Sequence, residues 1–311
     1  PTGFKDGKLY SVLPESGAGD FSVVRGSGAT RVNKDGLIES MANDIPRLDY
    51  TDGGCPVLLT EPQSTNLVVS SELNNVENIV VSASSYTVSF YGTGSITLSG
   101  AHSGTLTGTG VNDRVELTFT PSAGTLICTD SGVVDKKQVE ALPYATSYIP
   151  TSGVIATRLA DSVTGAGDAT TFNDSEGVLY FEGSVLANDG NSRFISISDG
   201  SSSNRVALLY YNVDDRIRAI VSSGGTKFVD KNVSASVLNN HKVAIKFAVN
   251  DFALWVNGVE VATDTTLNAP IGLDTLAFDL GGSSPFYGKA KDVRVYNTAL
   301  SDAELTELTT I

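Results

Sequence analysis

Apolar and polar residues alternate along much of this chain, most clearly between Lys242 and Ala262. Apolar side chains occupy every second position on both sides of a turn expected at Asn250-Asp251, which is the pattern of two half-buried antiparallel strands. The apolar positions are Val243, Ile245, Phe247, Val249, Phe252, Leu254 and Val256. Trp255, the only tryptophan, has the opposite parity, so we expect it on the other face of this hairpin together with Lys246.

The same pattern divides the chain into three segments and predicts an all-β fold. Residues 1–69 have few clean alternations and several turn signals, so we expect an extended N-terminal arm that is buried by its own chain or by a partner. Residues 70–153 contain short alternating strands separated by turns and predict a small antiparallel β-sandwich. Residues 154–311 contain a longer series of strand-like runs and predict a second, larger β-sandwich.

One short helix is expected at the C-terminal end of the third segment. Ser301 followed by Glu304 forms a capping box, in which each side chain satisfies a backbone N–H group at the start of the helix. Leu300, Leu305 and Leu308 then give a narrow apolar stripe at helical spacing. The third segment is therefore expected to be a sandwich that ends in one helix.

Composition and charge exclude several classes of protein. The 311 residues include 21 Lys and Arg against 35 Asp and Glu, and the formal net charge of −14 argues against nucleic acid as a partner. No apolar run reaches the roughly 20 residues of a membrane-spanning helix, so we expect no membrane insertion. No basic-then-apolar leader begins the sequence, and Pro1 is the residue that trimming of an initiator methionine would leave. We therefore expect synthesis in the cytoplasm without a signal peptide.

Cysteine and histidine are too sparse to suggest a metal or redox centre. Cys55 and Cys128 lie in different segments and are expected to be free thiols, although the sequence alone leaves a disulfide between them open. His102 and His241 are far apart and lack nearby ligand spacing, so we expect no zinc site.

The third segment resembles the concanavalin A-like, laminin-G-like lectin/glucanase superfamily. The resemblance rests on EGVLYFEGSV, on DFALWVNGVEV and above all on FYGKAKDVRVYNTALSDAELTEL. The first two segments look like parts of bacteriophage appendage proteins, meaning tail-fibre or head-fibre components. The residues that carry this likeness are GDFSVVRGSGATRVNKDGLIE in the arm and QVEALPYATSYIPTSG, which in such proteins closes a carbohydrate-binding-module-like sandwich.

The resemblance implies a virion surface protein with a jelly-roll lectin domain that binds a glycan. It implies other virion proteins as partners, a virion-attachment role for the arm, and a homo-oligomer, because phage fibres are usually symmetric trimers. A physical argument points the same way, since an arm that cannot make its own core is often buried between subunits.

A saccharide-binding surface is expected on the polar strand faces of the third segment. By parity, Tyr211, Arg216 and Arg218 fall on the outer side of one hairpin, as Trp255 and Lys246 do on another. In the resembled fold a curved sheet often binds glycans, and an aromatic ring with flanking cations suits an acidic sugar. The hypothesis is a site formed by these five residues for an anionic polysaccharide of the host surface.

A purely structural interpretation of the same residues stays open. Small side chains such as Ala244 and Ala253 beside Trp255 would also allow close packing beneath the arm or a long loop. Arg216 and Arg218 would then be solvated partners of neighbouring carboxylates.

We expect no metal and no catalytic centre. Many relatives in the resembled superfamily hold a calcium ion near the last strand, but the usual acidic position is Lys291 here, with Asp292 beside it. Calcium bound by the acid-rich loops stays an open alternative. The third segment also lacks the E-x-D-x-x-E run of the superfamily's glucanases, which supplies the two carboxylates that glycoside hydrolysis needs. A lyase that uses Tyr211 with Arg216 stays open.

Three functional hypotheses follow. The first is a bacteriophage surface protein that binds host glycans through residues 154–311. The second is a structural head-decoration or tail-assembly subunit, and the third is a polysaccharide-degrading enzyme. Binding to a glycan array separates the first from the second, and loss of polymer viscosity would support the third.

Overall fold

The computed structural model describes residues 2–5, 8–11, 21–211 and 214–311. These residues form β-strands and one short α-helix, which confirms the all-β prediction. That helix, within the described part of the chain, is too short and too polar to cross a membrane. Among the turn signals of residues 1–69 are Lys5-Asp6-Gly7 and Gly17-Ala18-Gly19, and all of these residues except Lys5 lie outside the described ones.

The chain divides into two compact units. The larger unit comprises residues 1–24, 44–61 and 161–311, and the smaller unit comprises residues 25–43 and 62–160. This differs from the expected boundaries at residues 69 and 153, because the first segment is shared between the units. Some of its short strands pair in the larger unit and others pair in the smaller one.

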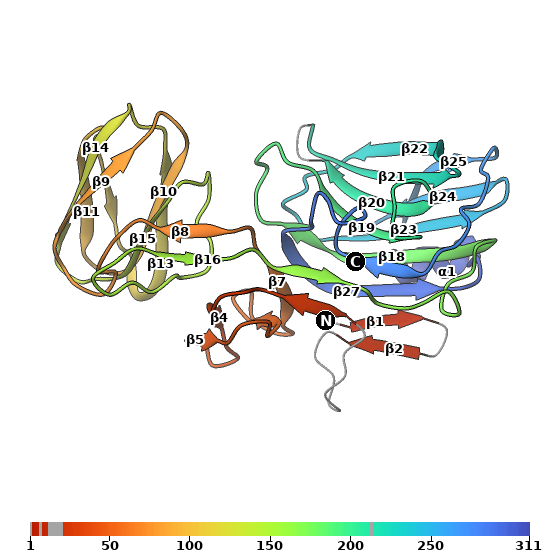
Figure 1. The fold of residues 1–311 in the computed structure, drawn as a ribbon, viewed down its shortest axis with the longest axis horizontal. Coiled ribbons are helices and arrows are strands. Elements are labelled where there is room, and N and C mark those ends of the chain that lie inside the picture. Colours follow the sequence, from red (N-terminus) through yellow and green to blue (C-terminus); the bar gives the residue numbers. More distant parts are fainter. Residues whose placement is uncertain (1, 6–7, 12–20, 212–213) are drawn as a thin grey trace. The chain divides into compact units, whose positions relative to one another are not determined.

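The larger unit is built on two sheets that share one hydrophobic core (Figure 1). The described strands of its nine-stranded sheet are β1 (Thr2–Lys5), β2 (Lys8–Ser11), β6 (Arg47–Asp49), β7 (Val57–Thr60), β18 (Glu176–Val185), β23 (His241–Ala248), β24 (Asp251–Val256), β25 (Val259–Asp264) and β27 (Gly288–Tyr296). Those of its five-stranded sheet are β19 (Arg193–Ser198), β20 (Arg205–Tyr211), β21 (Arg216–Ser223), β22 (Thr226–Ser234) and β26 (Thr275–Ala277). A separate pair joins β3 (Ser22–Val24) to β17 (Ser162–Thr164).

Alternate residues of both sheets point into the shared core, as the sequence pattern predicts. In the hairpin β23–β24, Phe247 lies opposite Phe252 and Ala244 lies opposite Trp255. The turn therefore comes one residue earlier than expected, at Val249 and Asn250, and Val249 is 56% exposed rather than buried. Asn250 has a φ of 58°, a left-handed conformation that asparagine adopts more readily than β-branched valine.

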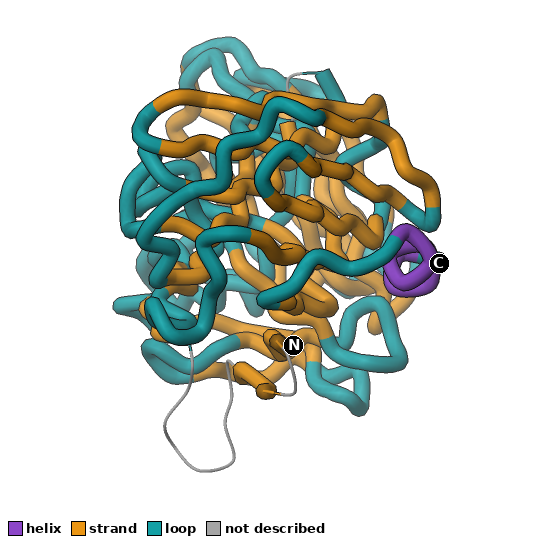
Figure 2. Tube along the Cα trace, turned by 90° about the vertical axis from the view of Figure 1, so that its right-hand side faces the viewer, coloured by secondary structure: helices purple, strands orange, loops and turns teal. Residues whose placement is uncertain are grey.

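The C-terminal helix α1 (Asp302–Thr309) packs against the outer face of the nine-stranded sheet, where Figure 2 shows it beside the strands. The predicted capping box is present, since Ser301 and Glu304 satisfy each other's backbone N–H groups. Leu305 is fully buried against the sheet, and Leu300 and Leu308 are partly buried beside it. The predicted stripe of leucines is therefore the surface by which the helix docks.

The smaller unit is the predicted small β-sandwich. Its three-stranded sheet contains β10 (Tyr86–Gly92), β13 (Gly110–Phe119) and β15 (Val134–Glu140). Its four-stranded sheet contains β9 (Val76–Val81), β11 (Ser95–Gly100), β12 (Gly104–Thr107) and β14 (Gly124–Ser131). Two further pairs join β4 (Ala29–Val32) to β5 (Ile38–Met41) and β8 (Ser64–Asn66) to β16 (Ala156–Arg158).

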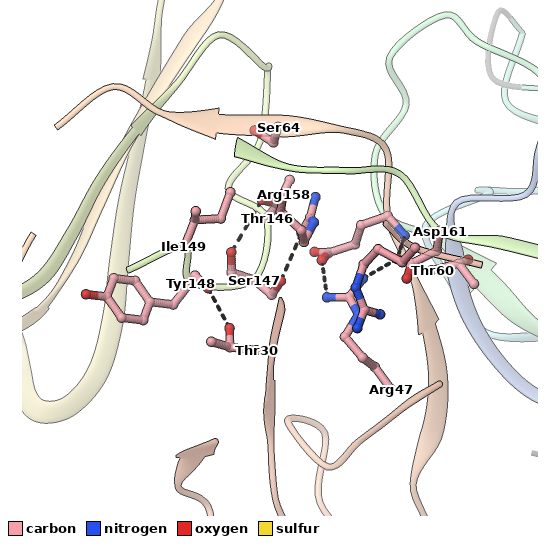
Figure 3. Close-up of polar contacts among 12 residues, drawn as sticks. Thr30, Arg47, Thr60, Ser64, Thr146, Ser147, Tyr148, Ile149, Arg158 and Asp161 are labelled. Carbon is pink, nitrogen blue, oxygen red and sulfur yellow. Dashed lines mark hydrogen bonds and ion pairs between the residues drawn. The ribbon is translucent and has the colours of Figure 1, made fainter. Parts of the chain in front are cut away.

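Residues 142–151 lie outside the strands and are held by buried polar side chains of the smaller unit. The carboxylate of Glu140 accepts a hydrogen bond of 2.9 Å from the backbone N–H of Thr146. The hydroxyl of Thr30 donates a hydrogen bond of 2.6 Å to the backbone carbonyl of Tyr148 (Figure 3). These bonds satisfy backbone groups that would otherwise be buried without partners.

A buried cluster of charges lies in the larger unit where the chain leaves it after Glu61 and re-enters it at Asp161. The guanidinium of Arg47 donates to the carboxylate of Glu61 at 2.5 Å and forms a second ion pair with Asp161 (Figure 3). The backbone N–H of Glu61 donates to the Asp161 carboxylate at 2.9 Å, and the backbone N–H of Asp161 donates to the Glu61 carbonyl at 3.0 Å. Burial alone would lower the pKa of Arg47, but the two carboxylates outweigh it and raise that pKa.

Both cysteines are free thiols, as expected, but their environments differ. Cys55 is exposed and Cys128 is buried. Burial, assisted by the nearby charge of Asp130, raises the pKa of the Cys128 thiol to about 12. A thiol reacts as its thiolate, so Cys128 stays unreactive in the folded protein at ordinary pH.

We expect a thiol reagent at pH 8 to titrate one cysteine in the native protein and two after denaturation. Because the folded-state pKa of Cys128 is raised from 9.0, the stability that its neutral form contributes is complete below pH 9 and is lost as the pH rises toward 12. Counting reacted thiols on native Cys55→Ser protein checks the assignment. Rapid labelling of that variant would contradict it.

Candidate functional site

The five residues expected to form one saccharide-binding surface lie on two different sheets. Trp255 and Lys246 belong to the nine-stranded sheet, whereas Tyr211, Arg216 and Arg218 belong to the five-stranded sheet. All five point outward, as their parity predicts, but the sheets pack through their inner faces. Their outer faces therefore point away from each other, and the expected single surface does not form.

Trp255 is covered rather than presented to a ligand. Its side chain is only 6% exposed and packs in a cluster with Tyr180, Ala244, Ala253 and Leu305. The element that covers it is α1. Trp255 is therefore packed, as the structural interpretation expects, but beneath the C-terminal helix and not beneath an arm or a loop. Its indole Nε1 is buried without a hydrogen bond in the described residues.

Lys246 lies near the start of the same helix and already has ionic partners. Its ammonium group lies 3.0 Å from a carboxylate oxygen of Asp251 and 3.8 Å from one of Asp302. Asp302 is in the first turn of α1. These contacts give Lys246 a role in joining the helix to the sheet.

Tyr211, Arg216 and Arg218 do lie together on the outer face of the five-stranded sheet. The expected pairing of Tyr211 with Arg216 is present, and the Arg218 guanidinium lies 5.7 Å from the centroid of the Tyr211 ring. Arg218 donates two hydrogen bonds of 2.5 Å to Asp230, and Arg216 donates one of 3.0 Å to Asn232. The bonds from Arg218 lower the pKa of Asp230 to about 2 although burial opposes them.

A hollow of about 460 Å³ opens on the outer face of the nine-stranded sheet, beside α1. Its floor comes from neighbouring strands, because register places Tyr180 of β18 between Arg294 of β27 and Ala244 of β23. The floor residues are Tyr180, Glu182, Lys242, Arg294 and Tyr296.

One flank of the helix and the turn before it form the wall of the hollow. Its residues are Leu300, Glu304, Glu307 and Leu308. They lie three or four positions apart and so share one side of the helix. The helix therefore covers Trp255 with Leu305 and lines the hollow with its neighbouring face.

The floor of the hollow is a network of paired charges. The Arg294 guanidinium lies 5.4 Å from the centroid of the Tyr180 ring and donates to Asp292 at 2.7 Å. Burial opposes the charged form of Arg294, but Asp292 outweighs it and raises the pKa of Arg294. Burial, assisted by the charge of Glu182, raises the pKa of Tyr180, so its hydroxyl stays a neutral donor.

Two charged side chains of the hollow are able to bind a ligand. Lys242 donates a hydrogen bond of 2.8 Å to the backbone carbonyl of Thr310, which carries no full charge. Glu307 is exposed, and its carboxylate has no hydrogen bond or ion pair to another described residue. Both can therefore bind hydroxyl or charged groups of a ligand without first losing an ionic partner.

No metal centre is assembled by the residues that the structure describes. Among them, no group of three or more histidine, cysteine, aspartate or glutamate side chains is placed to hold an ion. At the last strand, Asp292 is engaged by Arg294 and Lys291 pairs with Glu182 at 3.3 Å. The expectation that the protein holds no metal stays a prediction.

Comparison with known protein families identifies the fold of the larger unit. Residues 169–306 match the family model of the concanavalin A-like lectin/glucanases superfamily. No curated protein matches the chain.

Several solved structures are similar to part of the chain. One is the CBM40 domain of the Ruminococcus gnavus IT-sialidase bound to α2,3-sialyllactose, at 21% identity and a TM-score of 0.40, with 46% of this chain and 86% of that chain covered. Another is the NanB sialidase of Streptococcus pneumoniae, at 12% identity and a TM-score of 0.38, with 46% and 25% covered. A third is the binding domain of botulinum neurotoxin serotype D, at 13% identity and a TM-score of 0.39, with 47% and 39% covered.

These similarities are distant, so the assignment rests on the family match and on the two stacked sheets. The matched region begins before β18 and ends within α1. It includes β18, β23, β24, β25 and β27 of the nine-stranded sheet and the whole five-stranded sheet, and it contains the lining of the hollow except Glu307 and Leu308. Residues 169–306 are therefore similar to the concanavalin A-like lectin/glucanases and have a concanavalin A-like fold.

Proposed function

We propose that this chain binds a glycan through the hollow beside α1. The observation that carries the proposal is a cavity of about 460 Å³ whose lining combines an aromatic ring and leucines with cations and carboxylates. Small-molecule sites are typically concave, within a few hundred cubic ångströms, and mix apolar surface with a few convergent polar groups. The size of the hollow suits one or two sugar rings.

The chemistry of the lining suits a sugar unit that carries no net charge. Tyr296, Leu300 and Leu308 offer apolar surface to the C–H face of a pyranose ring. Lys242 and Glu307 offer a donor and an acceptor to its hydroxyl groups. Since Arg294 and Glu182 are already paired with Asp292 and Lys291, the hollow does not demand a charged ligand.

We further propose that the chain works at the surface of a bacteriophage virion, where it binds a polysaccharide of the bacterial host. Support comes from the phage-like phrases of residues 1–69 and 138–153 together with a lectin-like C-terminal unit. Other virion proteins and further copies of the chain, as a trimer, are the partners that this role requires. Antibodies against the chain should label purified particles in electron micrographs, and light scattering should give the mass of an oligomer.

We propose binding without cleavage of the glycan. Among the carboxylates of the hollow, Glu304 is engaged by the backbone N–H and hydroxyl of Ser301, and Glu182 accepts from Asn240. A pair of carboxylates free to act on opposite sides of a glycosidic bond is needed for hydrolysis. Release of reducing ends from a bound polysaccharide would make the protein an enzyme instead.

Tyr296→Ala is expected to weaken glycan binding by about tenfold or more, because a central aromatic contact commonly dominates such a site. Glu307→Gln, which leaves the packing of the helix intact, is expected to weaken it by about two- to fivefold. A glycan array identifies the oligosaccharide, and titration followed by Trp255 fluorescence measures its affinity. The indole is a suitable probe because it packs in the same cluster as Tyr180 and Tyr296.

The matched control is Tyr211→Ala, which removes an equivalent ring from the opposite sheet and should leave the affinity unchanged. Loss of binding in Tyr211→Ala with normal binding in Tyr296→Ala would move the site to the five-stranded sheet. A chain that labels particles but binds nothing on the array would be a structural subunit.

A further inference from the structure

The outer face of the five-stranded sheet carries three arginines, and they differ in what their charges contact. Arg218 forms a bidentate ion pair with Asp230. Arg216 donates to Asn232 and has Asp214 at 4.0 Å. An anion that bound either of them would have to compete with a partner of their own sheet.

Arg205, at the start of β20, is different. Within the described residues its side chain makes no hydrogen bond and no ion pair, and its Nε is buried without a partner. Burial is the only influence found on its charge, and it lowers the pKa of Arg205. A half-buried cation without a counter-charge is unfavourable, and this one lies in a chain whose formal net charge is −14.

Two hydroxyl groups flank Arg205 on the neighbouring strands. The sheet register places Ser198 of β19 on one side and Ser222 of β21 on the other. The Ser198 hydroxyl accepts a hydrogen bond of 3.2 Å from the backbone N–H of Gly200, so its own hydrogen is left to donate elsewhere. Both serines lie on the outer face, because they are directly opposite Arg205, but they are only 1% and 3% exposed. The partly exposed guanidinium of Arg205 is therefore the group that a ligand can reach.

We propose that Arg205 forms an oxyanion-binding subsite for the carboxylate or sulfate ester of an acidic saccharide. Its planar guanidinium can make two parallel hydrogen bonds to such a group. A bound oxyanion also neutralises the one arginine of this face that lacks a partner among the described residues. The subsite is separate from the hollow, which lies on the opposite outer face of the sandwich.

The test measures binding of glucuronate, glucose 6-sulfate, glucose and inorganic sulfate to the full chain by calorimetry at low salt. The two acidic sugars are expected to bind at least about tenfold more tightly than glucose, and this preference should weaken as salt is added. Arg205→Met should abolish the preference. Arg205→Lys should retain only part of it, because an ammonium group keeps the charge but loses the bidentate geometry. The two acidic sugars together show whether carboxylate or sulfate is preferred.

Two variants serve as controls. Arg218→Met removes a neighbouring arginine that is already paired, so it should change the affinity for acidic sugars by less than about twofold. Tyr296→Ala should leave this binding intact, which separates a failure of the subsite from a failure of the hollow. Melting curves identify any variant that does not fold. If Arg205→Met does not fold, the preference for acidic sugars in Arg205→Lys tests the proposal.

Equal binding of acidic sugars and glucose by the natural chain would overturn the proposal. So would an unchanged preference in Arg205→Met, or an equal loss in Arg218→Met. Inorganic sulfate that binds as tightly as the sulfated sugar would overturn the assignment to a saccharide.

Discussion

Arg47→Met is expected to lower the free energy of unfolding of the larger unit by about 3–5 kcal/mol, which is the range for breaking a buried ion pair by removing one partner. Arg47 is 0% exposed, and its two partners Glu61 and Asp161 are also buried. Its removal would take away the cation that both carboxylates contact. Denaturant unfolding followed by Trp255 fluorescence measures the effect, because the only tryptophan belongs to this unit.

The same substitution at an exposed ion pair provides the control. Arg218→Met removes one cationic partner of Asp230, which keeps Lys227 at 3.0 Å, and is expected to cost about 1 kcal/mol or less. Adding Glu61→Gln and Asp161→Asn to Arg47→Met should recover part of the lost stability, since the stranded charges are then gone. If the two arginine variants lost equal stability, burial would not be the cause, and the structural role given to the cluster would be wrong.

The sequence predicts the outward direction of each candidate residue but not the sheet to which it belongs. Parity is a local property, so Trp255, Lys246, Tyr211, Arg216 and Arg218 could all be placed on outer faces correctly. Sheet membership depends on pairing between distant strands. For this reason the sequence joined residues that the structure separates on opposite sides of the sandwich.

The hollow could not be predicted from the sequence for the same reason. Its floor exists because Tyr180 pairs with Arg294, more than a hundred positions further along the chain, and its wall exists because α1 docks beside them. The capping box and the leucine stripe predict the helix from a few neighbouring residues, but they do not say which face it covers. Tyr296 and Glu307 therefore carried no signal that would have marked them as site residues.

Arg205 illustrates a further limit. Its parity places it on the outer face, as for Arg216 and Arg218, and nothing in the sequence separates the three. The difference lies in their partners. Asp230 and Asn232 come from β22, and register brings them to the other two arginines. A residue that lacks a partner becomes visible only when its neighbours are known.

The contact between α1 and the sheet is the feature on which both the burial of Trp255 and the shape of the hollow depend. Leu305 is 0% exposed at the centre of this contact and packs in one cluster with Trp255, Tyr180 and Ala253. Eight residues are too few for a helix to be stable alone, so α1 holds its conformation mainly through this packing and its cap. Removing the central leucine should therefore release more than one contact.

Leu305→Ala is expected to cost about 2–4 kcal/mol and to shift the native emission of Trp255 to longer wavelength, because the cavity loosens the helix and admits water to the indole. The control is Leu238→Ala, the same change at a leucine that is 49% exposed, which should cost about 0.5 kcal/mol and leave the emission unchanged. Fluorescence spectra and denaturant unfolding of both variants provide the comparison. A native spectrum that stays unshifted in Leu305→Ala would mean that the indole is shielded by something other than the helix. If α1 forms the wall of the hollow, the affinity for glycan should fall in Leu305→Ala together with the shielding of the indole. If the helix does not shield the indole, the affinity should stay unchanged.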